Sequence, residues 1–324
     1  MITRRRFALA GAALVAFPPM LRAQRRLWRI GYHSASSAET NAGWLDAFRS
    51  GMAELGWSEA KHYVIDARYA EGDSSREARL AAELVATEPD VILTTAEASI
   101  LALIRITKTI PIVFGIAADP VGNGYAASLQ RPGGNATGLT TLGPDLAAKR
   151  LQLLKEITPH LSEVASLFEP LDAAAVSGIK GYEAAASHAN VRLRPIEIRR
   201  VSDIDAAFKA QKVTPDAYLI VAGRMLNIHR RTVSERVLKT RRPAISSSVI
   251  WAEAGLLMTY AASSATNFKR AAVYVDKILK GAKPGELAIE QPTKFDLVIN
   301  ARTAKEMGLA IPQSLRVRAD RVIE

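Results

Sequence analysis

Hydrophobic positions along the chain follow two alternating periods. Short apolar or alternating runs, typical of strands, are separated by segments in which apolar residues recur every three or four positions, as in amphipathic helices. In the first half, this pattern predicts strands at 29–33, 63–69, 91–95 and 111–115 and helices at 44–55, 75–87 and 97–107. The same order returns later, with strands at 163–168, 192–198, 217–221 and 243–246 and helices at 173–189, 203–211 and 226–240.

The repeated order indicates a duplicated unit. Strands that alternate with helices predict parallel sheets with right-handed crossovers. We therefore expect an α/β fold with two doubly wound parallel-sheet lobes and a cleft between them. Ligands of doubly wound sheets bind outside the carboxyl ends of the strands, so the cleft is the expected ligand site.

The candidate ligand-binding residues are those that follow the predicted strands. They are Ser34, Ser36, Thr95, Glu97 and Asp119 in the first unit and Glu169, Asp172, Gly223, Arg224, Ser246 and Ser247 in the second. Hydroxyls, carboxylates and glycines suit hydrogen bonding to a small polar ligand. The same residue types are also common in structural turns, so each position keeps both interpretations.

The residues needed for common catalytic or metal sites are missing from the sequence. The 324 residues include no cysteine, which excludes disulfides, thiolate zinc sites, iron–sulfur clusters and cysteine nucleophiles. The five histidines form no pair at metal-ligand spacing. The sequence contains no nucleophile elbow and no phosphate-binding loop of the Walker type. We expect no metal, no cofactor and no enzymatic activity.

The N-terminus predicts export. Consecutive arginines at 4–6 precede an apolar run at 7–17, and Ala23 is a small residue at a plausible cleavage point. This pattern predicts a twin-arginine export signal at 1–23, with removal near Ala23 and localisation in the periplasm. A general secretion signal with an extra arginine and a weak membrane anchor are the alternatives. The apolar run is shorter than the roughly 20 residues that span a bilayer.

Part of the positive charge belongs to this leader. The formal net charge is +11, and the leader holds four arginines and no acid, which leaves +7 on the mature chain. The densest basic stretch, 224–242, has the spacing of an amphipathic helix with a solvated face. No stacking aromatics accompany it as nucleic-acid binding would require, so we expect no nucleic-acid partner.

Three groups of residues carry a family resemblance. The first comprises IPIVF at 110–114, ADPVG at 118–122 and SLQRPGGNATG at 128–138; the second is RAAVYVDKILKGAKP at 270–284; the third comprises EQPTKFDLVIN at 290–300, TAK at 303–305 and GLAIP at 308–312. Together they resemble the ABC transporter substrate-binding protein family that includes tryptophan- and tyrosine-type uptake proteins. The resemblance covers essentially the whole mature chain.

The resemblance implies a type 1 periplasmic-binding-protein fold, with two lobes joined by three crossovers. The duplicated pattern places the crossovers near 138–144, 260–264 and Pro292. Lobe 1 would then comprise 24–141 plus about 262–292, and lobe 2 would comprise 142–261 plus about 293–324. The lobe of the last strand is left open.

The resemblance also implies a function. A monomeric protein would capture a small organic, amino-acid-like ligand by hinge closure and deliver it to the membrane permease of an ABC transporter. The alternative is a periplasmic sensor of the same fold that passes ligand occupancy to a membrane receptor. The lack of a transmembrane helix or fused signalling domain favours transport.

Two candidate positions depart from the family pattern. Many relatives read Thr-Gly-Thr-Pro-Ala after the third strand, whereas Glu97 stands in this segment here. Glu97 could pair with a ligand ammonium group or stabilise the helix N-terminus. Relatives often carry Asp or Asn where this chain has Gly223 and Arg224. Arg224 could clamp a carboxylate or begin the solvated basic helix.

Three further residues keep a ligand role and a structural role open. Asp119 matches the family's Asp-Pro after the fourth strand, and it is either a cleft carboxylate or the residue that fixes the following turn. Tyr260 and Trp251 are available as stacking partners for a ligand, and each could equally belong to the core.

Overall fold

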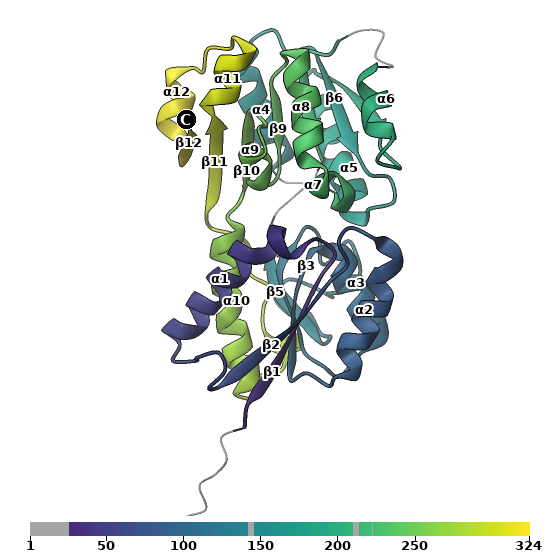
Figure 1. Cartoon of the computed structure of the whole chain (residues 1–324), viewed down its shortest axis with the longest axis vertical. Helices are drawn as coiled ribbons and strands as arrows, with labels where there is room; N and C mark the ends of the chain where they lie inside the picture. Colours follow the sequence, from purple (N-terminus) through teal and green to yellow (C-terminus); the bar gives the residue numbers. More distant parts are fainter. Residues whose placement is uncertain (1–25, 142–145, 210–213, 222) are drawn as a thin grey trace, which may run out of the picture.

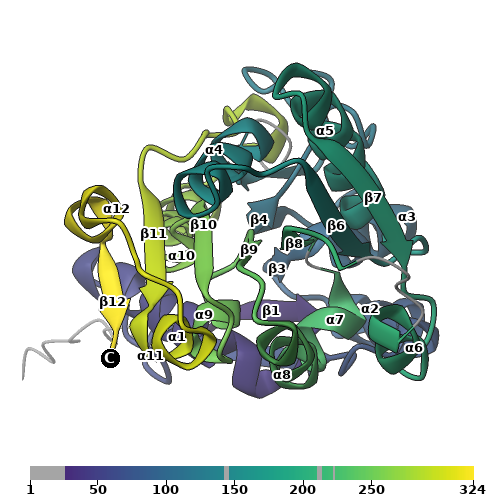
Figure 2. The same cartoon turned by 90° about the horizontal axis from the view of Figure 1, so that it is seen from above.

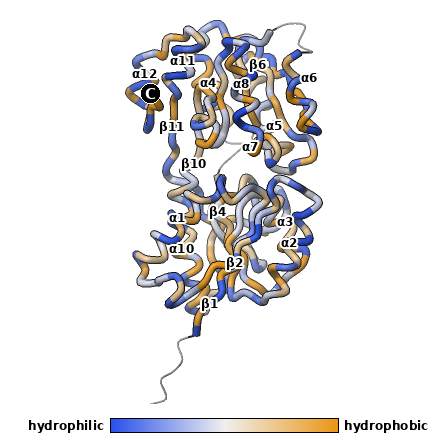
Figure 3. Tube along the Cα trace, in the orientation of Figure 1, coloured by the Kyte–Doolittle hydropathy of each residue, from blue (hydrophilic) through white to orange (hydrophobic). Residues whose placement is uncertain are grey.

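Two lobes stacked along the long axis make up the protein (Figure 1). The computed structural model describes residues 26–141, 146–209, 214–221 and 223–324. The sequence-predicted export signal at 1–23 lies outside the described residues. The residues of high hydropathy follow the strands at the centre of each lobe (Figure 3).

The first lobe is built on a parallel sheet. Its strands are arranged in the order β2-β1-β3-β4-β5, and every pair is parallel. They are β1 (Trp28–Ser34), β2 (Tyr63–Tyr69), β3 (Val91–Thr95), β4 (Ile112–Ala117) and β5 (Ala136–Thr140). The helices α1 (Ala38–Glu54) and α10 (Ser264–Leu279) pack on one face, and α2 (Ser74–Ala86) and α3 (Ala96–Ile106) pack on the other.

The second lobe is built on a longer sheet, whose described strands have the order β12-β11-β10-β9-β8-β6-β7. They are β6 (Glu163–Phe168), β7 (Arg192–Glu197), β8 (Ala217–Ile220), β9 (Ala244–Ser246), β10 (Met258–Ala262), β11 (Phe295–Asn300) and β12 (Arg321–Ile323). The last strand thus joins this sheet. The pair β10–β11 is antiparallel, so the expectation of a purely parallel sheet is wrong here. Strand β11 enters from the other lobe instead of following a crossover helix.

Helices cover both faces of the second sheet (Figure 2). One face carries α4 (Ala147–Ile157) and α5 (Ala173–His188). The other carries α6 (Asp203–Lys209), α7 (Arg224–Ile228), α8 (Arg230–Thr240) and α9 (Ile250–Glu253). The remaining elements are the short 3-10 helix η1 (Pro284–Glu286), α11 (Ala301–Met307) and α12 (Gln313–Arg318). The single helix expected at 226–240 is divided into α7 and α8 at His229, whose φ and ψ are −91° and 18°.

The two sheets repeat one topology. The order β2-β1-β3-β4-β5 of the first corresponds to β7-β6-β8-β9-β10 of the second, which confirms the predicted fold class with two doubly wound lobes. The chain leaves the first sheet after β5, returns after β10 through α10 and leaves again to form β11. Two of these passages are joined by backbone hydrogen bonds, from the N–H of Thr140 to the carbonyl of Glu290 (2.9 Å) and from the N–H of Glu290 to the carbonyl of Gly138 (3.0 Å).

Candidate functional site

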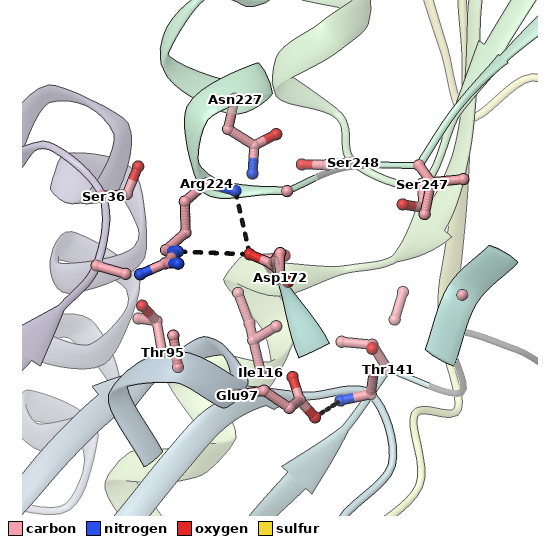
Figure 4. Close-up of a pocket in the computed structure, with 18 of the residues that line it drawn as sticks. Ser36, Thr95, Glu97, Ile116, Thr141, Asp172, Arg224, Asn227, Ser247 and Ser248 are labelled. Atoms are coloured by element: carbon pink, nitrogen blue, oxygen red, sulfur yellow. Dashed lines mark hydrogen bonds and ion pairs between the residues drawn. The ribbon is translucent and has the colours of Figure 1, made fainter. Parts of the chain in front are cut away.

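A cavity of about 170 Å³ lies between the lobes, where the strands of both sheets end. Its wall includes polar residues from both lobes (Figure 4). From the sequence-predicted set, Ser36, Thr95, Glu97, Asp172, Gly223, Arg224 and Ser247 line it. The apolar part of the wall includes Trp44, Ile116, Tyr182, Val221 and Ala262. The first lobe and the second therefore both contribute to one small site.

Hydroxyl groups form the first-lobe wall after β1 and β3. The hydroxyls of Ser34 and Thr95 share a hydrogen bond of 3.0 Å, and the Ser34 Oγ also accepts from the backbone N–H of Ser36 at 3.1 Å. Ser34 is fully buried and is not among the lining residues. The Ser36 Oγ has no hydrogen-bond partner among the described residues. Ser34 therefore positions two cavity-lining residues instead of lining the cavity.

Glu97 is a buried carboxylate in the first turn of α3. Its side chain is held by the loop after β4, since one oxygen accepts from the backbone N–H of Ala118 (2.6 Å) and of Asp119 (3.2 Å). The hydroxyl of Tyr125 donates to the same oxygen at 3.1 Å. Burial raises the pKa of Glu97, and these three hydrogen bonds oppose the rise only in part.

The raised pKa of Glu97 predicts a pH-dependent effect of Glu97→Gln on the empty protein. A carboxyl whose pKa is higher in the folded state stabilises the fold below its unfolded pKa, and this contribution is lost as the pH rises through the folded pKa. Glutamine retains an oxygen that can accept from Ala118 and Asp119. We expect the variant to melt above the parent at about pH 8 and close to it at about pH 4. A melting-temperature difference that grows toward low pH would contradict this assignment.

Asp172 and Arg224 line the cavity from the second lobe and interact with each other (Figure 4). The guanidinium Nε of Arg224 lies 3.5 Å from a carboxylate oxygen of Asp172. Asp172 also accepts from the backbone N–H of Ala175 (3.2 Å) and of Arg224 (3.3 Å). Both side chains are largely buried, at 8% and 16% exposure. The pair therefore places a carboxylate and a guanidinium group next to each other at one wall of the cavity.

Arg150, on α4, is a cavity residue that the sequence reasoning missed. It is 2% exposed. Its Nε donates to the carbonyl of Tyr260 at 2.7 Å, and an Nη donates to the hydroxyl of Tyr182 at 2.8 Å. The sequence carries a signal, because Arg150 directly precedes Leu151, Leu153 and Leu154 and shares their buried side of the helix. Because α4 follows no strand of its own sheet, a prediction from strand ends does not reach it.

Besides Ser34, four predicted residues are not among the lining residues. Asp119 accepts from the backbone N–H of Gly122 at 2.8 Å and so fixes a turn. Glu169 accepts from the N–H of Leu226 at 2.7 Å and of Met225 at 3.2 Å, at the start of α7. The structure places the other two within the second sheet: the Ser246 hydroxyl donates to the carbonyl of Ile220 at 3.0 Å, and the Tyr260 ring stacks on Phe295 with centroids 5.9 Å apart.

Trp251 has a supporting position. It is fully buried, and its indole Nε1 donates to the Oδ1 of Asn227 at 2.8 Å. Asn227 lines the cavity from α7, so Trp251 fixes its orientation.

Within the described ranges, no group of three acidic or histidine side chains could hold a metal ion. No helix in the described part of the chain is long and apolar enough to cross a membrane.

Comparisons with known proteins agree with this geometry. The chain is 22% identical over 263 residues to the tyrosine-binding protein of Clostridioides difficile (strain R20291). The match covers 81% of this chain and 75% of that protein. A conserved domain protein from Vibrio cholerae is 25% identical, with a TM-score of 0.86, over 92% of this chain and 100% of the other. An ABC domain in complex with L-Trp from Streptococcus pneumonia has the same TM-score and coverage at 24% identity.

The family assignment rests on most of the chain. The family model of the ABC transporter substrate binding proteins matches residues 37–323, which include both sheets except the first strand and every residue that lines the cavity apart from Ala35 and Ser36. Members of this family bind solutes and are not enzymes. The chain belongs to the ABC transporter substrate binding protein family.

Proposed function

We propose that this protein is the exported solute-binding component of an ABC uptake transporter, and that it captures a small, amino-acid-like ligand between its lobes. The single observation that carries the proposal is the cavity between the lobes, whose wall combines Glu97 of the first lobe with Asp172, Arg224 and Arg150 of the second. Carboxylates on both sides of the cleft and two arginines on the second-lobe side suit a ligand that bears both charges. The ligand would then be passed to a membrane permease.

The size and the apolar part of the cavity support a small ligand. Its volume of about 170 Å³ is below the roughly 300–1,000 Å³ of sites that hold drug-sized molecules. Trp44, Ile116 and Tyr182 offer apolar contacts to a side chain. A relative is named as a tyrosine-binding protein and a structural neighbour is a complex with L-Trp, which supports an aromatic amino acid as the first ligand to test.

Capture would proceed by hinge closure. The proposed lobes are 24–141 with about 262–292, and 142–261 with about 293–324. Contacts between them support closure around a ligand: Glu39 and Arg230 form an ion pair of 3.8 Å, and Gly72 lies against Ile228 of α7. Since the passages from β10 to α10 and into β11 lie on the same side of the molecule (Figure 1), the lobes could part on the other side.

A cavity-filling substitution tests the ligand site. We expect Ala98→Phe to abolish the thermal stabilisation by ligand, because Ala98 lines the cavity from the start of α3 and a phenyl ring would occupy the ligand's space. The matched control is Ile106→Phe, at the far end of the same helix and 41% exposed.

The readout is a thermal-shift screen of the purified protein against amino acids and related carboxylates. A ligand present at about 100 times its dissociation constant adds about 2.7 kcal/mol of stability. The parent and Ile106→Phe should both gain this stabilisation. An undiminished shift in Ala98→Phe would show that the ligand binds elsewhere, and binding without any transporter-dependent uptake in cells would favour the sensor alternative.

A further inference from the structure

The first-lobe carboxylate of Glu97 has no cationic partner among the described residues. It is 2% exposed, and the donors to its bound oxygen are two backbone N–H groups and the Tyr125 hydroxyl, all of them neutral. The charged group that acts on it is Asp172 of the other lobe, a second carboxylate, which adds to the rise of its pKa after burial. A buried carboxylate normally requires a positive partner.

Negative charge is in excess around this part of the cleft. Three carboxylates that are each at most 7% exposed lie near the guanidinium of Arg224: Glu77, Glu169 and Asp172. Glu97 lines the same cavity and is 2% exposed. Arg224 is paired with Asp172 at 3.5 Å. Burial opposes ionisation of Glu77, but the His33 imidazole, whose Nε2 lies 3.1 Å from Glu77 Oε1, the hydrogen bond from Ser99 and the charge of Arg224 lower its pKa. Arg224 therefore interacts with carboxylates of both lobes, and Glu97 has no cationic partner among the described residues.

We propose that Glu97 and Asp172 form a carboxylate pair across the cleft that opposes closure of the empty protein, and that the ligand's ammonium group bridges the pair. This inference rests on the proposed capture of a ligand in this cleft, and it defines the ligand as a molecule that brings a cationic nitrogen. The second cation of the wall, Arg150, then faces a ligand that also carries a carboxylate.

The physical reason lies in desolvation. In an open cleft both carboxylates are hydrated, and their repulsion is weak in water. Closure without a ligand buries them together. Because Arg224 already pairs with Asp172, Glu97 must take up a proton or remain as an uncompensated charge, and both outcomes are costly. An ammonium group placed between them removes this cost. The ligand therefore binds the closed state more tightly than the open one, which is the condition for ligand-driven closure.

The conformational test needs no ligand. The chain contains no cysteine, so spin labels on Arg79→Cys and Arg200→Cys would be unique. These positions are 57% and 80% exposed and lie in α2 and just before α6, on the side of the molecule away from β10 and α10 (Figure 1). Glu97→Gln should raise the closed fraction of the empty protein by about fivefold or more, and Asp172→Asn should shift it in the same direction.

The matched control is Glu59→Gln, which removes one carboxylate of the first lobe at a half-exposed site paired with Arg49. It should leave the distance distribution unchanged. An unchanged closed fraction in Glu97→Gln would overturn the proposal, as would an equal shift in Glu59→Gln. Should Asp172→Asn fail to fold, Glu97→Gln alone still decides the result.

Three probes test the ammonium requirement by calorimetry: L-tyrosine, tyramine, which lacks the carboxylate, and phloretic acid, which lacks the amino group. The parent should bind phloretic acid about thirtyfold or more weakly than L-tyrosine, and Glu97→Gln should lose most of this preference. Equal binding of L-tyrosine and phloretic acid by the parent would overturn the proposal. If none of the probes binds, that result counts against the proposed function, while the spin-label distances still decide whether the carboxylate pair opposes closure.

Discussion

The Gly138→Ala variant is expected to lose about 4 kcal/mol of unfolding free energy. Gly138 in β5 has a φ of 149°, a conformation that L residues rarely adopt. An added Cβ would overlap the carbonyl oxygen of Phe114 in β4 and lie 2.7 Å from the Phe114 nitrogen. Neither atom can move without breaking the β4–β5 ladder, next to a passage between the lobes.

Urea unfolding, followed by circular dichroism, measures this loss. The control is Gly134→Ala, a few residues earlier in the chain, where an added Cβ meets no atom within 4 Å. That variant should stay within about 0.5 kcal/mol of the parent, with the same dependence on urea concentration. An equally small loss in Gly138→Ala would mean that the strands shift easily, contrary to the close approach in this sheet.

The Gly72→Val variant is expected to bind the ligand about tenfold more weakly. Gly72, in the loop after β2, has a φ of 77°, and an added Cβ would overlap the Cδ1 of Ile228 in the other lobe. A bulky residue here would hold the lobes apart, so the ligand would lose part of its contacts.

A double-mutant cycle separates closure from local strain. Ile228→Ala creates space opposite position 72 and should restore most of the affinity of Gly72→Val, while leaving the backbone strain at residue 72 in place. Calorimetry with the ligand found in the thermal-shift screen measures all four proteins. If the double variant binds as weakly as Gly72→Val, the loss arises from strain within the first lobe and not from the contact between lobes.

Much of the site followed from the order of elements alone. Because parallel strands point the same way, residues after β1, β3, β6 and β8 had to gather at one edge of each sheet. The prediction therefore brought Ser36, Thr95, Asp172 and Arg224 to the cavity wall. The order of elements does not distinguish these residues from Ser34. Ser34 does not line the cavity, but its hydroxyl forms hydrogen bonds with Thr95 and with the backbone of Ser36.

Other residues could not be assigned from local sequence. Asp119 and Glu169 also follow strands, yet each carboxylate accepts backbone N–H groups within its own lobe. Arg150 enters the cavity from a helix on the face of the second sheet, and nothing near it in the sequence indicates Tyr182 as its partner. Such choices depend on which backbone donors and side chains the packed lobes bring within hydrogen-bond distance.

The sequence by itself determined the duplicated strand–helix order and the edge of each sheet at which a ligand could bind, because hydrophobic periodicity and strand direction are local properties. The family was indicated separately, by the resemblance of segments within 110–138, 270–284 and 290–312. Only the tertiary structure decided that β11 pairs antiparallel with β10 and that Glu97 and Asp172 line one cavity from the two lobes. The physical reason is that burial and the pairing of charges depend on contacts between segments far apart in the chain, and on how the two lobes meet.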